Sequence, residues 1–277
     1  MVYPRKLVLI RHGQSEANIV QKGLHHPPEG FLRDTDVGRR LTKLGVWQAQ
    51  MAGDWLRANG YVFSRQYVSP FARAMETAVN LNISDEWLID DLWRERDWGE
   101  YGLYSKDDQR KIFKDSTEMK DKFFWYWKPA GGESLATGVR SRVNSILTHL
   151  GRMDESEAIL GVGHGELFST FQFVIEKMTP QQWEEREEDP HFTIRNANII
   201  EYSRVNPENP NDIRAFYKWG RVTNPWDASL SHYGGEWYEL SSRRYTMEEM
   251  RLIIDSSKQY FPDMDFDYDN HAIKPKN

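Results

Sequence analysis

The chain of 277 residues is long enough to bury a substantial hydrophobic core, and its length fits one domain with additions. The formal net charge of −6 comes from acidic and basic residues interspersed along the chain, which excludes a general nucleic-acid surface because neutralising phosphates requires clustered cations. The absence of cysteine excludes a disulfide scaffold and a thiolate zinc site, so we expect a cytoplasmic protein. The first apolar run, residues 7–10, is too short for a signal-peptide core or a membrane span, and we expect no membrane partner.

The first predicted elements are a strand and a helix. Residues 7–10 are all apolar and precede Arg-His-Gly, which is typical of a buried central strand followed by a loop at its carboxyl end. Thr42 is a plausible N-cap for a helix that ends at Asn59-Gly60. The apolar side chains that share one face of this helix at three- and four-residue steps are Leu44, Trp47, Met51 and Trp55.

The middle of the chain predicts short elements and an insertion. Residues 67–69 and 87–89 indicate short strands, and Ser69-Pro70 predicts the N-cap and first turn of a helix that reaches about Asn80. Residues 105–130 indicate a helical insertion that forms a lid. Its aromatic cluster, residues 123–127, fits either the core of the lid or a wall for a substrate, and we favour core packing.

The next segments repeat the pattern of strand, short polar loop and helix. A helix is predicted from Ser134 to Leu150, and a buried strand over 158–162 leads to Gly163-His164-Gly165 and an apolar helix over 167–177. This repetition predicts an α/β fold, a three-layer α/β/α sandwich with a mostly parallel central sheet. Such a sheet gathers the loops that follow its strands at one edge.

The rest of the chain predicts an extension. A strand over 194–202 is followed by a turn-rich connection and an edge strand over 214–222, and a helix is predicted over 246–257. Residues 263–277 resemble an acidic, poorly ordered terminus. We therefore expect a main domain over 1–205 and a C-terminal extension over 206–277 that packs on it, with exposed aromatic side chains that suit a homodimer contact.

One tripeptide and a series of shorter segments carry a family resemblance. Arg11-His12-Gly13 resembles the signature of the histidine phosphatase superfamily, of the phosphoglycerate-mutase-like type. Further family-like segments follow in the expected order: Leu41-Thr42 with Gly45 and Gln48-Ala49, Ser69 with Arg73-Ala74 and Thr77-Ala78, Glu95-Arg96 with Gly99, Gly132-Glu133-Ser134, His164-Gly165, and Asn196. The resemblance covers roughly the first two hundred residues, and the loop around Glu95 looks closer to the broad phosphatase branch than to the glycolytic mutases.

The residue types in these segments suit phosphoryl transfer. Arg11 and Arg73 offer planar guanidinium groups that match phosphate oxygens. His12 can attack phosphorus as a neutral imidazole, and His164 can donate to the oxygens where charge develops. Glu95 is the candidate general acid for the leaving alkoxide, and then the base for water. We therefore expect phosphomonoester hydrolysis through a phosphohistidine on His12.

The resemblance also implies a set of substrate contacts. Asn18 resembles the family's additional phosphate contact, and Gly13, Ser15 and Gly165 are expected at the substrate. Arg96 is expected to hold either the substrate or Glu95. We expect no cofactor and no metal, because no metal-binding spacing is present. His25 and His26 lie in a loop that either covers the site or is merely exposed.

Two departures and two alternatives stay open. Gly163 stands where a serine is frequent in the family, and Glu166 stands where a small or apolar residue is usual, so Glu166 would add negative charge if it pointed inward. One alternative is a mutase that returns the phosphoryl group to a second hydroxyl of a phosphoglycerate. The other is an idle relative that binds phosphorylated ligands or a protein. The natural small-molecule substrate, a phosphomonoester, is left open.

Overall fold

A computed structural model describes residues 3–31, 36–153 and 158–260, together with the backbone of the pairs 266–267 and 272–273. The chain divides into two compact units, Met1–Ser241 and Ser242–Asn277, and each is described by itself. The sheet and every predicted site residue belong to the first unit. No helix in the described ranges is both long enough and apolar enough to cross a lipid bilayer.

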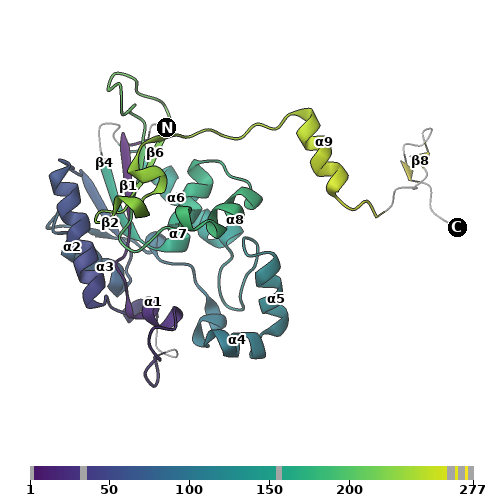
Figure 1. The fold of residues 1–277 in the computed structure, drawn as a ribbon, viewed down its shortest axis with the longest axis horizontal. Helices are drawn as coiled ribbons and strands as arrows, with labels where there is room; N and C mark the ends of the chain where they lie inside the picture. Colours follow the sequence, from purple (N-terminus) through teal and green to yellow (C-terminus); the bar gives the residue numbers. More distant parts are fainter. Residues whose placement is uncertain (1–2, 32–35, 154–157, 261–265, 268–271, 274–277) are drawn as a thin grey trace. The chain divides into compact units, whose positions relative to one another are not determined.

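The first unit is built on a seven-stranded mixed sheet with the order β3-β2-β4-β1-β5-β6-β7 (Figure 1). Its strands are β1 (Lys6–Arg11), β2 (Arg65–Val68), β3 (Leu88–Ile89), β4 (Ala158–Gly163), β5 (Ile199–Ser203), β6 (Trp219–Thr223) and β7 (Tyr238–Glu239). The pairs β3-β2, β2-β4 and β4-β1 are parallel, whereas β5, β6 and β7 continue the sheet in antiparallel pairs. The predicted α/β fold with a parallel central sheet is confirmed.

Helices cover both faces of this sheet. The α-helices of the first unit are α1 (Glu16–Gln21), α2 (Lys43–Ala58), α3 (Ala72–Leu81), α4 (Lys106–Ile112), α5 (Lys114–Lys122), α6 (Arg140–Leu150), α7 (Gly165–Ile175) and α8 (Pro180–Glu188). Successive side chains of β1 point to opposite faces, so Leu7 and Leu9 join one buried cluster and Val8 and Ile10 join another. The first cluster contains side chains of α6 and α7, and the second contains side chains of α2 and α3. The two clusters join the sheet to a helical layer on each of its faces, which gives the three layers of the α/β/α sandwich.

The buried face of α2 differs from the apolar face that the spacing predicted. Leu44 and Trp47 are exposed, although the helix begins after the predicted N-cap Thr42. The buried residues of α2 are Gly45, Ala49, Ala52, Gly53 and Leu56. Small residues form the buried face of α2 because this helix packs closely on α3. A Cβ at Gly53 would collide with the carbonyl of Leu81.

Two predicted boundaries were wrong. The helix expected from Ser69-Pro70 begins at Ala72, because Ser69 hydrogen-bonds elsewhere and Phe71 takes the N-cap position. The strand expected over 214–222 is β6, which begins only at Trp219, and β6 is not the edge strand, because Tyr238–Glu239 pairs with its outer side. Residues 219–239, expected in the extension, thus supply two strands of the main sheet.

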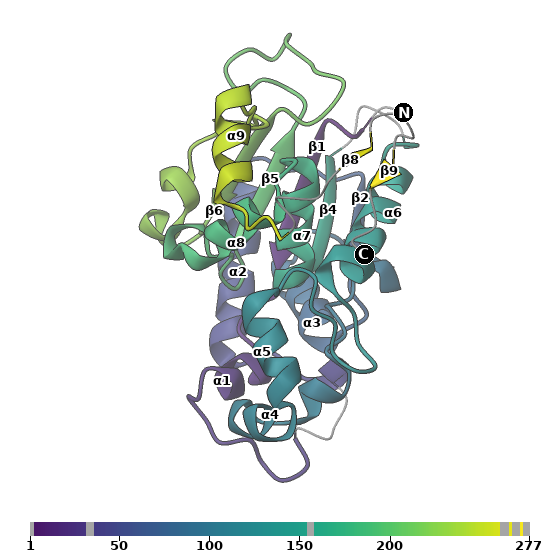
Figure 2. The same cartoon turned by 90° about the vertical axis from the view of Figure 1, so that its right-hand side faces the viewer.

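The insertion contains two helices, and the second unit contains one helix and two short strands among its described residues. Helices α4 and α5 form the predicted helical insertion, and in both views they gather with α1 at the same end of the first unit (Figures 1 and 2). In the second unit, α9 (Met247–Ser256) begins after its N-cap Thr246, as predicted. This unit also holds the short strands β8 (Phe266–Asp267) and β9 (Ala272–Ile273). Most of the predicted disordered terminus over 263–277 lies outside the described residues.

Candidate active site

The ends of two neighbouring strands bring the two histidines together. In the parallel pair of β1 and β4, Arg11 lies opposite Gly163, so the loops that follow both strands leave the same edge of the sheet. The amide of His12 donates to the carbonyl of Gly163 at 2.9 Å. The His12 and His164 rings are buried, with centroids 5.2 Å apart.

A cavity of about 280 Å³ opens at this edge. The predicted site residues that line it are Arg11, His12, Asn18, Arg73, Glu95 and Gly165. Those that do not line it are Gly13, Ser15, Arg96 and His164, although the His164 ring contacts His12. The fold therefore brings most of the predicted residues, from four separate segments, to one place.

His12 is held as a neutral imidazole with one free nitrogen. Its Nδ1 lies 2.7 Å from the carbonyl oxygen of Gly13, and because a carbonyl only accepts, Nδ1 carries the proton. The lone pair is therefore on Nε2. Burial, reinforced by the charges of Arg73 and Arg11, lowers the pKa of His12 well below its ordinary value of 6.5. The side chain has the form that a nucleophile needs at neutral pH.

The two guanidinium groups of the cavity have different partners. Arg11 donates from Nη1 to the carbonyl of Ile194 at 2.6 Å, while its Nε is buried and meets no hydrogen-bond acceptor among the described residues. Arg73 donates to the backbone carbonyl and to the carboxylate of Asp36, both at 2.8 Å. A phosphate bound to Arg73 would lie against the Asp36 carboxylate. A Cβ at Gly165 would press on the Arg11 guanidinium at 3.3 Å, so the glycine leaves room for it.

Asn18 is oriented by two acceptor contacts. Its Oδ1 accepts from the amide of Ser15 at 3.2 Å and from Nδ2 of Asn196 at 3.0 Å. Asn196 also donates to the carbonyl of His12 at 3.0 Å. With Oδ1 occupied, the amide nitrogen of Asn18 is the atom that can donate to a ligand in the cavity.

Gly13 serves the backbone of the loop. Its amide donates to Oγ1 of Thr77 at 3.0 Å, and a Cβ at this position would collide with the carbonyl of Gly45. The loop that carries His12 therefore packs directly on the start of α2, where only glycines allow the two backbones to meet.

His164 has a serine partner. Its Nε2 lies 2.7 Å from Oγ of Ser69, and both side chains are fully buried. Burial lowers the pKa of His164 well below 6.5, and the charges of Arg73, His12 and Arg11 add to the effect. The ring also packs edge-on against Phe71 at 4.9 Å. His164 is thus a neutral, fixed imidazole beside the nucleophile.

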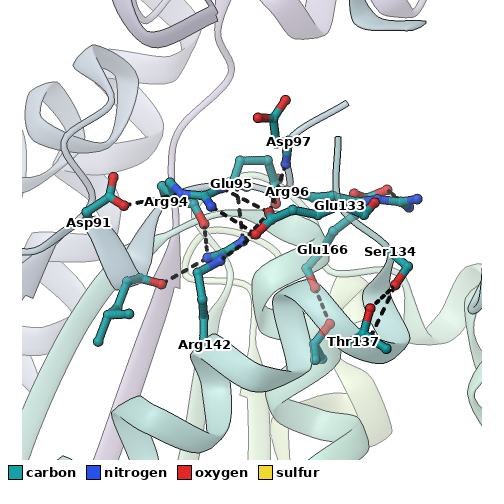
Figure 3. Close-up of polar contacts among 12 residues, drawn as sticks. Asp91, Arg94, Glu95, Arg96, Asp97, Glu133, Ser134, Thr137, Arg142 and Glu166 are labelled. Carbon is teal, nitrogen blue, oxygen red and sulfur yellow. Dashed lines mark hydrogen bonds and ion pairs between the residues drawn. The ribbon is translucent and has the colours of Figure 1, made fainter. Parts of the chain in front are cut away.

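The segment that carries Glu95 is fixed through its backbone (Figure 3). The carbonyl of Glu95 accepts from Arg94 at 3.2 Å and from Arg142 at 3.3 Å. Arg142 also donates to the carbonyls of Leu92 and Arg94, at 2.9 and 2.8 Å. The carboxylate of Glu95 accepts the amide of Arg96 at 3.0 Å. Helix α6 therefore holds the loop through Arg142.

Glu133 joins the same arginines. Its carboxylate lies 2.8 Å from Arg94 and 2.9 Å from Arg142. Figure 3 draws the contacts among these three side chains. Burial alone would raise the pKa of Glu133, but hydrogen bonds from Arg142 and Arg94 outweigh it and lower this pKa to about 2. The Glu133 carboxylate is therefore charged at neutral pH, and it anchors both arginines.

Arg96 does not line the cavity. Its guanidinium donates to the carbonyls of Glu133 and Trp127 at 2.9 and 2.8 Å and lies over the Trp98 ring at 5.0 Å. It holds the Glu95 segment against the insertion, and its contact with a substrate stays a prediction.

Comparison with known proteins identifies the family. The model of the histidine phosphatase superfamily (branch 1) matches residues 7–204. The chain belongs to this superfamily. Among curated relatives, the 2,3-bisphosphoglycerate-dependent phosphoglycerate mutase of Methylorubrum populi is 31% identical over 183 residues, which cover 63% of this chain and 81% of that protein. The same mutase of Nitrobacter winogradskyi is 34% identical over 184 residues, covering 64% and 84%.

Solved structures share the fold. A putative alpha-ribazole-5'-P phosphatase from Escherichia coli superimposes with a TM-score of 0.59 at 22% identity, covering 77% of this chain and 96% of that one. A mycobacterial glucosyl-3-phosphoglycerate phosphatase gives 0.56 at 22% identity, covering 79% and 96%. At these identities the likeness concerns the fold alone. An enzyme acting on phosphate esters is supported, because the superfamily consists of phosphatases and mutases.

Glu166, which the sequence interpretation singled out as a departure from the family pattern, lines the cavity. One carboxylate oxygen of Glu166 lies 3.8 Å from Nη1 of Arg96, and the other is buried without a hydrogen-bond partner in the described structure. Burial raises the pKa of Glu166 far above its ordinary value; Arg96 opposes this effect and Glu95 adds to it. Glu166 therefore keeps its proton to a higher pH than an exposed glutamate does.

The sequence interpretation assigned no site role to several residues that line the cavity, among them Asp36, Trp98 and Glu187. Asp36 belongs to the short 3₁₀ turn Asp36–Gly38, and Glu187 belongs to α8. Neither has a local motif, because each reaches the cavity only through the packing of distant segments. Trp98 had one available signal, its place between Glu95 and Gly99 in a family-like loop. Across the described ranges, no three His, Asp or Glu side chains are grouped as metal ligands.

Proposed function

We propose that the protein is a phosphatase that hydrolyses phosphomonoesters through a phosphohistidine on His12. The observation that carries the proposal is the neutral His12, with its proton on Nδ1 and its lone pair on Nε2, in a cavity shared with Arg11 and Arg73. A neutral imidazole beside two guanidinium groups is matched to an incoming phosphate dianion.

In the first step, Nε2 of His12 forms a bond to phosphorus while the bond from phosphorus to the ester oxygen breaks. Arg11 and Arg73 bind the equatorial oxygens, and His164 donates a hydrogen bond as their charge grows. Glu95 gives its proton to the leaving alkoxide, so a neutral alcohol departs. Asn18 donates from its amide nitrogen to the same phosphoryl group.

In the second step, water displaces the imidazole. The Glu95 carboxylate takes a proton from water as the water oxygen bonds to phosphorus, and the bond from phosphorus to nitrogen breaks. Inorganic phosphate leaves, His12 is neutral again, and Glu95 carries its proton for the next cycle. No metal and no cofactor takes part in this scheme.

The mutase reaction is the second candidate, because the curated relatives named above are phosphoglycerate mutases. The charges of the cavity favour hydrolysis. A phosphoglycerate carries its carboxylate close to the ester, where it would meet the Asp36 carboxylate that Arg73 already holds at 2.8 Å. Like charges at this range are destabilising, whereas a phosphatase does not need to hold a second acid there.

The test replaces the nucleophile. We expect the wild-type protein to release phosphate from p-nitrophenyl phosphate in the presence of a chelator, and His12→Ala to lose at least about a thousandfold in kcat, since no other group forms the intermediate. Brief reaction with radiolabelled substrate is expected to leave an acid-labile label on residue 12. Equal rates for the two proteins would contradict the proposal.

Product analysis separates the two reactions. Any turnover of 3-phosphoglycerate is expected to give free phosphate and glycerate. A 2-phosphoglycerate product without phosphate release would establish the mutase instead, and binding without either product would point to an idle relative. A cytoplasmic location and a homodimer stay predictions from the sequence.

A further inference from the structure

A second and larger cavity adjoins the phosphate cavity within the first unit. Its volume is about 640 Å³, and it lies between the segment around residues 17–31 and the insertion helices α4 and α5. The two cavities share three lining residues, Ala17, Gln21 and Trp98. A ligand that extends past these residues would therefore occupy both cavities. A volume of this size is typical of sites that bury a drug-sized molecule.

The walls of this second cavity combine rings and cations. Aromatic side chains that line it are Phe31, Trp98, Tyr104 and Phe124. Its charged side chains are Arg39, Lys106, Lys120 and one carboxylate, Asp107, and the exposed His25 and His26 also line it. Arg39 is already paired with Asp36 at 3.0 Å. The two lysines therefore leave a net positive charge opposite Asp107.

Lys120 is the best-placed cation. Its Nζ lies over the rings of Tyr101, Trp98 and Trp127, at 5.1, 5.5 and 5.9 Å from their centroids. No carboxylate of the described residues comes within 4.0 Å of this ammonium group. The rings hold the charge in place, and the half-buried ammonium lacks an anionic partner.

We infer that this cavity binds the leaving group of the substrate, and that this group combines a planar apolar part with a second negative charge that pairs with Lys120. The inference rests on the proposed function. The planar part would lie against Trp98, Tyr104 and Phe124, where ring stacking is favourable.

The two cavities differ in charge, which sets where the second anion sits. In the phosphate cavity Arg73 already pairs with the Asp36 carboxylate, and Arg11 and Arg73 would bind the phosphate, whereas the second cavity has one carboxylate and two lysines that pair with no carboxylate of the described residues. An anion next to the ester would meet the Asp36 carboxylate, and an anion beyond Trp98 would meet Lys120. The substrate class is therefore a bulky phosphomonoester whose second acidic group is remote from the scissile bond.

The kinetic test uses three esters of increasing complexity: phenyl phosphate, 2-naphthyl phosphate and 6-phosphonooxy-2-naphthoate. We expect the wild-type kcat/KM to be higher for the naphthoate than for 2-naphthyl phosphate by about tenfold. Lys120→Met is expected to abolish this preference, and Lys120→Arg to keep most of it. Lys122→Met is the matched control on the same helix, because Lys122 is exposed and does not line the cavity.

A binding measurement makes the inference independent of turnover. The product 6-hydroxy-2-naphthoate is fluorescent, and we expect the wild type to bind it several-fold more tightly than Lys120→Met, with Lys122→Met equal to the wild type. Equal binding by the wild type and Lys120→Met, or phosphate release without a preference for the naphthoate, would overturn the inference. If none of the three esters releases phosphate, the proposed function is contradicted. The role of the second cavity is then still decided by the binding measurement.

Discussion

His12 is neutral in the folded protein because burial and two nearby guanidinium groups, Arg73 and Arg11, disfavour a further positive charge. The same causes act on His164. A single hydrogen bond to Gly13 then selects the tautomer of His12. At the residue scale, the site is thus defined by protonation states that depend on burial and on neighbouring charges, and these can be tested with pH.

The first test at this scale is the pH dependence of activity. Because the pKa of His12 is lowered well below 6.5, the imidazole keeps its lone pair as the pH falls through 6.5. We expect the acidic limb of kcat/KM, which reports the free enzyme, to show no loss attributable to His12 until the pH is well below 6.5. A profile on p-nitrophenyl phosphate that falls with an apparent pKa of 6.5 or above, and that is assigned to His12 by NMR titration, would contradict this expectation.

Glu166 is expected to make the protein less stable as the pH rises. Its folded pKa is raised, so the folded state keeps a proton that the unfolded chain loses above pH 4.5. The contribution of Glu166 to the free energy of unfolding is therefore most favourable below pH 4.5, and it is lost progressively as the pH rises above 4.5. We expect the free energy of unfolding of Glu166→Gln, measured with urea, to exceed that of the wild type by on the order of 1 kcal/mol at pH 8. At pH 5 we expect little difference between the two proteins.

Glu118→Gln is the matched control for Glu166, because Glu118 is exposed on α5. A difference between Glu166→Gln and the wild type that is the same at pH 5 and pH 8 would show that packing, rather than ionisation, is responsible.

At the scale of elements, the loop that carries Glu95 depends on a network from α6 and the segment before it. Arg142 and Arg94 hold the loop by its carbonyls, and Glu133 holds the two arginines. Glu133 is a positioning residue, because it does not line the cavity. The segment Gly132-Glu133-Ser134 is one of the family-like segments of the sequence. In the structure, its carboxylate pairs with Arg94 and Arg142.

Glu133→Gln is expected to disturb both stability and catalysis. The neutral amide leaves the guanidinium groups of Arg94 and Arg142 without their anionic partner. This loss is expected to lower the free energy of unfolding by about 3 kcal/mol. We expect kcat to fall more than tenfold as Glu95 loses its position, with a smaller change in KM because the phosphate contacts of Arg11 and Arg73 remain. Urea unfolding and steady-state kinetics measure the two effects.

The pH dependence of the Glu133 contribution provides the control. Its folded pKa is lowered to about 2, so the stabilisation is complete above pH 4.5 and is lost as the pH falls toward 2. Glu133→Gln and the wild type are therefore expected to converge in stability in acid. Persistence of the full difference at pH 3 would contradict the assignment of the pKa shift to these ion pairs.

At the scale of the whole molecule, the first unit contains the sheet, both hydrophobic clusters and both cavities. The strands β6 and β7 extend this sheet, so residues up to Ser241 complete it. Every described residue that lines the two cavities belongs to the first unit. Folding and the chemistry of the site therefore depend on the first unit.

A truncation tests this division. We expect residues 1–241 to fold with a Tm within a few degrees of the full chain and to keep kcat/KM on p-nitrophenyl phosphate within about threefold, because no core cluster is interrupted. A truncation after residue 205, which removes β6 and β7, is expected to unfold, since Val222 of the core and the pairing partner of β5 are lost. Loss of activity in both truncations would contradict the division.

The sequence by itself determined the strand ends that carry Arg11, His12 and His164, the family, and the parallel central sheet, because apolar runs, glycines and polar loop residues act within a few residues of chain. It also indicated Arg73, Glu95 and Asn18, which the cavity brings together. Only the tertiary structure decided that small residues of α2 face the core, that Ser69 pairs with His164 and that Asp36 pairs with Arg73. These partners are far apart in the chain, and packing between helices, rather than local preference, sets which side chains meet.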